Sequence, residues 1–162
     1  MDFTHDTLAT GRRFRTLNLV DTFTRECLAI EVGSSLPSTR VTRVLDRVLA
    51  NYGQPERIQV DNGPEFAGQV LDNWAYQRGV QLSFIQPGKP MQNGHVESFN
   101  GKFRDECLSQ HWFLDLDDAR TIIEVWRQDY NTVRPHSALG NLPPALFRQA
   151  LAKPEKTCIT TG

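Results

Sequence analysis

The sequence predicts an α/β domain that contains a mixed β-sheet with helices on its faces. Two observations support this fold class. Residues 13–20 begin with polar and apolar residues in alternation and end apolar, and a polar turn separates them from the largely apolar run 27–32, which is typical of a β-hairpin. After residue 37, segments with apolar residues at helical spacing alternate with short apolar runs. A hairpin followed by alternating helices and strands indicates a mixed sheet covered by helices.

Local patterns place each element. The strands are expected at residues 2–6, 13–20, 27–32, 57–60 and 80–85. The helices are expected at about 38–52, 66–79, 95–107 and 116–130, with a short last helix from 143. Ser38 is a candidate N-cap for the first helix, and Gly53 ends it. Residues 86–94 contain two prolines and two glycines, which predicts a loop.

Length and composition are those of one globular domain. The chain has 162 residues, of which 39% are apolar and 23% are charged. We expect residues 1–150 to form the domain and residues 151–162 to form a disordered tail. No stretch approaches the roughly 18 apolar residues that a membrane span needs, and no export signal opens the chain. A cytoplasmic location is therefore expected.

The cysteines indicate neither a zinc site nor a disulfide framework. Cys27, Cys107 and Cys158 are odd in number, far apart and outside any CxxC pair. A reducing compartment is the simplest setting for such a set.

Three carboxylates stand at positions that suit metal binding. Asp61 follows an apolar strand and precedes Asn-Gly-Pro, and ligands bind at this end of strands in open α/β sheets. Asp2 would lie beside it on the first strand, and Glu97 occupies the first turn of a helix, one residue from its buried stripe. Converging carboxylates repel one another unless cations neutralise them. Oxygen ligands alone favour magnesium or manganese over zinc.

Other interpretations of these carboxylates stay open from the residues alone. Asp61 in Asp-Asn-Gly-Pro is also a typical turn former. Glu97 near a helix N-terminus also suits the helix dipole. Asp6, four residues after Asp2, is a competing carboxylate on the same strand.

Several motifs resemble the integrase catalytic core of DDE-type transposases and retroviral integrases. The run from Val60 to Phe66 resembles the second-aspartate motif, and the run from Gln92 to Asn100 resembles the glutamate motif. The gap between Asp61 and Glu97 is 97 − 61 − 1 = 35 residues, the spacing of the DD(35)E group. Residues 2–4 resemble the first-aspartate strand, and residues 130–139 resemble the C-terminal motif of bacterial insertion-sequence transposases.

This resemblance, which runs from Asp2 to about Phe147, implies a ribonuclease-H-like fold, with a five-stranded mixed sheet and helices on both faces. It implies that Asp2, Asp61 and Glu97 hold two Mg²⁺ or Mn²⁺ ions, with Asp2 bridging both. Such ions activate an attacking oxygen and stabilise the leaving oxygen of a phosphodiester. The implied function is DNA transposition by hydrolysis and strand transfer, in a bacterial cytoplasm at the nucleoid. The implied partners are transposon ends, target DNA and further copies of the chain.

Six residues are candidates for the DNA-binding face. They are Lys89, Gln92, Asn93, His95, Lys102 and Arg104. Arg104 matches the basic residue that these transposases carry seven positions after the glutamate. For Arg134 and His136 the sequence leaves open whether they contact DNA or only pack. The net charge of −1 shows no basic excess, so either basic residues gather locally or the main DNA-binding domain lies outside this chain.

Two departures from the family pattern keep rival functions open. Family members carry residues before the first aspartate that complete its strand, and usually an upstream helix-turn-helix region, whereas this sequence starts at Met1. The first strand is therefore expected to be truncated. The alternatives are a ribonuclease-H-like nuclease without strand transfer, and a catalytically impaired remnant that only binds DNA or a partner transposase.

Overall fold

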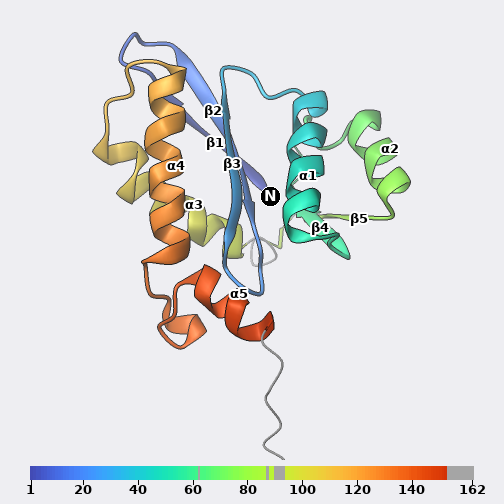
Figure 1. The fold of residues 1–162 in the computed structure, drawn as a ribbon. Coiled ribbons are helices and arrows are strands. Elements are labelled where there is room, and N and C mark those ends of the chain that lie inside the picture. Colours follow the sequence, from blue (N-terminus) through green and yellow to red (C-terminus); the bar gives the residue numbers. More distant parts are fainter. Residues whose placement is uncertain (62, 87, 90–93, 153–162) are drawn as a thin grey trace, which may run out of the picture.

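The computed structural model describes residues 1–61, 63–86, 88–89 and 94–152, and most of the predicted tail lies outside these ranges. Within them the chain forms five strands and five α-helices (Figure 1). The strands are β1 (Asp2–Thr7), β2 (Arg13–Val20), β3 (Cys27–Gly33), β4 (Arg57–Val60) and β5 (Gln81–Phe84). The helices are α1 (Ser38–Tyr52), α2 (Gln69–Arg78), α3 (Gly94–Glu106), α4 (Leu116–Thr132) and α5 (Pro144–Ala152). No helix of the described part is long and apolar enough to cross a membrane.

The five strands form two hydrogen-bonded ladders. β1, β2 and β3 make an antiparallel meander in which Asp2 lies opposite Asn18. β4 and β5 pair in parallel. The ladders meet where the Met1 amino group donates a 2.7 Å hydrogen bond to the Gln59 carbonyl. The prediction of a mixed, five-stranded α/β fold is confirmed. The boundary between the two ladders, which separates β1 from β4, is called the seam below.

Helices cover both faces of the sheet, as the sequence predicts (Figure 1). On one face, α1 and α2 pack on the strands around a core that includes Leu17, Leu45 and Trp74. On the other face, α3 and α4 enclose a second core that includes Phe99 and Phe103. The apolar stripes of these helices bury their side chains against the sheet, which is the dominant favourable contribution to folding.

One helix starts later than the sequence indicates. The apolar residue Phe66 favours a start near position 66, but α2 begins at Gln69 because residues 63–68 form turns. Phe66 is fully buried all the same, and its ring stacks on Phe3 of β1 at 4.8 Å. The segment that follows Asp61 is thereby fixed against the strand that begins at Asp2.

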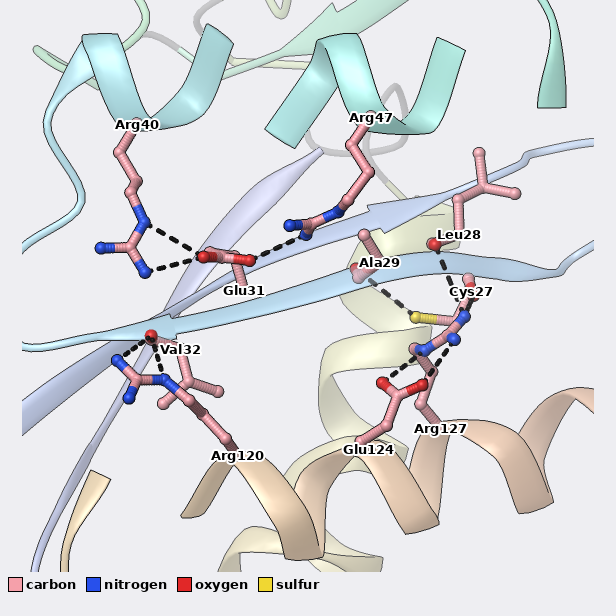
Figure 2. Close-up of polar contacts among 10 residues, drawn as sticks. All are labelled: Cys27, Leu28, Ala29, Glu31, Val32, Arg40, Arg47, Arg120, Glu124 and Arg127. Carbon is pink, nitrogen blue, oxygen red and sulfur yellow. Dashed lines mark hydrogen bonds and ion pairs between the residues drawn. The ribbon is translucent and has the colours of Figure 1, made fainter. Parts of the chain in front are cut away.

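The edge strand β3 is attached to α1 through Glu31, a carboxylate on the strand itself (Figure 2). Glu31 accepts hydrogen bonds from Arg40 and Arg47 of α1, at 2.8 Å each. Burial of Glu31 opposes its ionisation, but the Arg47 and Arg40 guanidiniums hold the pKa of this carboxyl below its usual range.

The α4 side satisfies the backbone of the same strand. Arg120 donates to the Val32 carbonyl at 3.3 Å, and Arg127 donates to the Cys27 carbonyl at 2.8 Å (Figure 2). The Asn131 amide closes the start of β3, since it accepts from Cys27 N and donates to Cys27 O, both at 2.8 Å. Covering an edge strand in this way prevents it from pairing with another chain.

Candidate functional site

Asp2 begins β1 and is fixed through both of its oxygens. Its Oδ1 accepts a 2.8 Å hydrogen bond from Phe3 N, and its Oδ2 accepts a 3.0 Å bond from the Asn100 amide of α3. The side chain is half-buried. The strand and the helix therefore hold this carboxylate in one orientation.

A buried polar network sets the orientation of Asn100. The Asn18 amide, fully buried on β2, donates to Asn100 Oδ1 at 2.8 Å and accepts from the Thr16 hydroxyl at 2.9 Å. Thr16 in turn contacts the Thr4 hydroxyl. Because Asn100 Oδ1 is taken by Asn18, its NH₂ group must face Asp2. Sequence reasoning did not assign Asn18 or Asn100 a role, although Asn100 lies within the predicted glutamate motif.

Asp61 follows β4 and is held by its own turn. Gly63 N donates a 2.8 Å hydrogen bond to Asp61 Oδ1. A Cβ atom at position 63 would lie 2.8 Å from the same oxygen, closer than Cβ contacts occur in proteins. Asp61 is thus a turn former, as one interpretation of the sequence expected, and glycine is needed beside it because any side chain would displace the carboxylate.

The structure brings Asp2 and Asp61 together across the seam between the two ladders. Burial raises the pKa of the Asp2 carboxyl, and the Asp61 charge and a hydrogen bond between the two side chains raise it further. The hydrogen bond that Phe3 N donates to the Asp2 carboxylate lowers this pKa. The Asp61 carboxylate therefore disfavours the ionised form of Asp2.

Glu97 lies in the first turn of α3, and its side chain is exposed. No group of three acidic, histidine or cysteine side chains within the described residues is close enough to hold a metal. Glu97 therefore does not complete a cluster with Asp2 and Asp61 in this conformation. It does lie one helical turn before Asn100, so the helix that carries Glu97 is hydrogen-bonded directly to Asp2.

The chemistry of the donors fits a hard divalent cation. Asp2 and Asp61 offer only carboxylate oxygens, and Glu97 would add further oxygens of the same kind. Such ligands suit Mg²⁺ or Mn²⁺. Burial and the neighbouring Asp61 raise the pKa of Asp2, and the Met1 amino group opposes this shift.

The predicted DNA-binding residues differ in the exposure of their side chains. Lys89 and Arg104 have exposed side chains, whereas Lys102 is half-buried. His95 is exposed and contacts Arg25 from the β2–β3 turn. Gln92 and Asn93 lie outside the described residues.

The C-terminal motif, residues 130–139, has mainly structural contacts. Tyr130 packs edge-on against Phe99 at 5.1 Å, and Asn131 binds the backbone of β3. Arg134 forms an ion pair with Glu106 at the end of α3. His136 is 7% exposed, and its ring packs edge-on against Tyr130 at 4.8 Å. The motif joins α4 to both the sheet and α3.

Two family models, both described as integrase core domain, match the sequence at residues 1–90 and 78–144. An insertion element IS407 protein of 31.7 kDa from Burkholderia multivorans is 52% identical over 147 residues, which cover 91% of this chain and 53% of the relative. An insertion element IS476 protein from Xanthomonas euvesicatoria is 48% identical, with 91% and 42% covered. The chain thus spans about half the length of these relatives.

Solved structures share the fold. The HTLV-2 integrase catalytic core domain in complex with magnesium has a TM-score of 0.70 and 21% identity, over 88% of this chain and 89% of that chain. A chain of the simian T-cell lymphotropic virus intasome has a TM-score of 0.80 and 21% identity, with 96% and 54% covered. From the matched models, the insertion-element relatives and the shared ribonuclease-H-like fold, it follows that this chain belongs to the integrase core domain family.

Proposed function

We propose that this chain is the catalytic core of a DNA transposase that depends on divalent metal ions held by Asp2, Asp61 and Glu97. The observation that carries the proposal is the carboxylate pair at the seam between β1 and β4, fixed by Asn100 and Gly63. The family is one of DDE polynucleotidyl transferases, and relatives from insertion elements support DNA as the substrate.

The residues of the site would have distinct roles. Asp2, Asp61 and Glu97 would hold the metal ions through their carboxylate oxygens, and Asp2 is already fixed through both of its oxygens. Bound Mg²⁺ or Mn²⁺ would activate the attacking water or 3′-hydroxyl and stabilise the leaving oxygen of the phosphodiester. Asn100 would hold Asp2, and Gly63 would hold Asp61, in the orientation that binding needs.

The proposed substrates are transposon ends and a target DNA. The exposed cations Lys89 and Arg104, with Gln92 and Asn93, would follow the phosphate backbone. The HTLV-2 integrase catalytic core domain has been solved in a dimeric and a trimeric form, and a structurally similar chain is part of the simian T-cell lymphotropic virus intasome. We propose by analogy that several copies of this chain act together on DNA.

Metal binding is the first test. Isothermal titration calorimetry with MnCl₂ and MgCl₂ should show binding to the wild-type chain and its loss in Asp61→Asn. Asp72→Asn is the matched control, since Asp72 is an exposed carboxylate on α2, and it should bind metal as the wild type does. Binding that is equally weak in all three proteins would favour a non-catalytic remnant.

A strand-transfer assay then separates the enzyme classes. The protein is incubated with Mn²⁺, a labelled duplex that ends in a recessed 3′-hydroxyl, and a supercoiled plasmid target. Covalent joining of the label to the plasmid, absent in Asp61→Asn, supports the transposase. Metal-dependent hydrolysis without joined product would instead identify a ribonuclease-H-like nuclease.

A further inference from the structure

A polar cavity of about 460 Å³ lies between the β2–β3 turn, α3 and the segment after α4. Its α3 lining includes His95, Ser98 and Lys102, which share one helical face. Glu97 and Asn100 project from the opposite face at about 100° per residue, so the cavity is distinct from the carboxylate site. The cavity is lined by the cationic side chains of Arg25, Lys102 and Arg134 and by the rings of His95 and His136.

Positive charge gathers in this cavity. Burial lowers the pKa of Lys102, and the neighbouring Arg134 and Arg25 lower it further. Arg134 has a carboxylate partner in Glu106, but within the described part of the chain Lys102 forms no ion pair. Like charges held this close favour binding of an anion between them.

His136 adds an unsatisfied polar atom. The residue is 7% exposed, and within the described residues its Nε2 has no hydrogen-bond partner. Buried polar atoms in proteins are nearly always paired, so an unpaired one in a cavity wall indicates a ligand or water. Burial lowers the pKa of His136, as do Lys102, Arg134 and Arg25, while a hydrogen bond with the Tyr130 backbone raises it. A bound anion would offset these positive charges. The His136 ring would then bind a proton from solvent and donate a hydrogen bond to the anion through Nε2.

The backbone around the cavity is strained. Arg25 has a φ of 61° and Asn141 has a φ of 62°, and they are the non-glycine residues with positive φ among those described. Both line this cavity. The left-handed conformation is unfavourable for arginine, and such residues persist where the surrounding structure requires them, often at binding sites.

We infer that this cavity is a phosphate-binding site and that its ligand is a backbone phosphate of DNA. The identification of the ligand as DNA rests on the proposed function. The assignment of a phosphate site rests on the cluster of cations and on the unpaired Nε2 atom of His136. Helix α3, which lines the cavity, carries Glu97 on the opposite face. The roughly 10 Å width of a helix corresponds to about three nucleotides at about 3.4 Å each. A strand at the carboxylates would therefore reach the cavity a few nucleotides away.

Phosphate binding is tested with inorganic phosphate. NMR titration of the His136 ring should show that phosphate raises its pKa in the wild type and not in Lys102→Ala. Arg43→Ala, which removes an exposed cation on α1, should respond as the wild type does. An unchanged response in Lys102→Ala would overturn the site. Asp61→Asn should keep the phosphate response whether or not the metal site exists, so failure of one proposal is distinguishable from failure of the other.

DNA binding is tested by fluorescence anisotropy with a labelled duplex. Lys102→Ala should weaken binding at least about tenfold, the effect of losing a charge-assisted hydrogen bond. It should also reduce the slope of log K against log salt by about 0.9. Lys102→Arg should restore most of the affinity, and Arg43→Ala should leave it unchanged. If inorganic phosphate binds but Lys102→Ala binds DNA normally, the ligand is a free phosphate compound and the DNA assignment is wrong.

Discussion

Asp61 owes its orientation to the residue two positions later. Because a Cβ at position 63 would meet the end of the Asp61 side chain, the substitution Gly63→Ala should turn the carboxylate away rather than disrupt the fold. We expect a loss of Mn²⁺ affinity of about tenfold or more, as for other residues that orient metal ligands. The free energy of unfolding should change by less than about 1 kcal/mol. Calorimetry and urea denaturation measure the two effects.

Gly101→Ala is the matched control for that substitution. A Cβ at position 101 of α3 would meet no atom within 4 Å. Alanine should therefore leave metal affinity unchanged and stabilise the helix by up to about 1 kcal/mol. Equal metal affinities for the two alanine variants would show that Gly63 does not orient Asp61.

The carboxylate pair should cost stability when no metal is bound. The pKa of Asp2 is raised, first by burial and then by Asp61, so the folded chain binds this proton more tightly than the unfolded chain. Stability is therefore lost as pH rises from the ordinary value of 3.8 through the raised folded pKa. Asp61→Asn removes the neighbouring charge and should raise the melting temperature at pH 7 in EDTA. The gain should shrink as pH falls through the raised pKa of Asp2, because this carboxyl is then neutral, and a lower melting temperature at pH 7 would contradict this account.

At the scale of elements, α4 stabilises the sheet by binding its edge. The Asn131 amide binds both backbone groups of Cys27, and alanine at this position leaves the buried Cys27 N–H without this acceptor, whereas the Cys27 carbonyl keeps its bond from Arg127. Asn131→Ala should destabilise the protein by roughly 1–3 kcal/mol in urea denaturation. Thr132→Ala is the control, since Thr132 is exposed and bonds only its own helix, and it should cost less than about 0.5 kcal/mol. Similar losses for both variants would show that the edge contact contributes little.

The elements themselves were predictable because their signals are local. Apolar patterns located four strands and four helices, while the prolines at 143 and 144 marked the last helix and residues 2–6 were expected as a remnant strand. The start of α2 was wrong, since Phe66 is buried from a turn rather than from a helix. The polar supports were not predictable. Asn131 and Cys27 are 104 residues apart in the sequence, and Asn18 and Asn100 are 82 residues apart. No local sequence pattern predicts hydrogen bonds over such separations. Strand ends and motif spacing pointed to the carboxylates, and the structure confirms the meeting of Asp2 and Asp61 but leaves Glu97 apart.

Stability of the whole molecule should fall with acid in two stages. The pKa of His136 is lowered, by burial and by Lys102, Arg134 and Arg25, so this ring stays neutral in the fold while the unfolded chain takes a proton below about pH 6.5. Stability is then lost as pH falls from there toward the folded pKa. The pKa of Glu31 is also lowered, despite burial, by Arg47 and Arg40, and its contribution is lost as pH falls below its ordinary value of 4.5.

Melting temperatures between about pH 8 and 3 in phosphate-free buffer measure this profile. His136→Gln should reduce the slope near pH 6. The remainder is due to His95, whose pKa is lowered by burial and Arg25, and to the Met1 amino group, whose pKa burial lowers to about 6. Glu31→Gln should reduce the slope below pH 4.5 and leave the upper stage intact. A profile that neither substitution alters would rule out these groups as the source.

Metal binding should also act on the molecule as a whole, because the two carboxylates belong to different ladders. Asp2 lies on β1 and Asp61 follows β4, and the contacts between the two ladders include the Met1–Gln59 hydrogen bond and the Phe3–Phe66 stack. An ion bound by both carboxylates would join the ladders and offset their repulsion. Magnesium at 100 times its Kd should therefore stabilise the fold by about 2.7 kcal/mol. Hydrogen exchange in β4 and β5 should slow at the same time. Asp61→Asn should abolish both effects and Asp72→Asn should retain them, whereas equal stabilisation of Asp61→Asn would show that magnesium acts elsewhere on the protein.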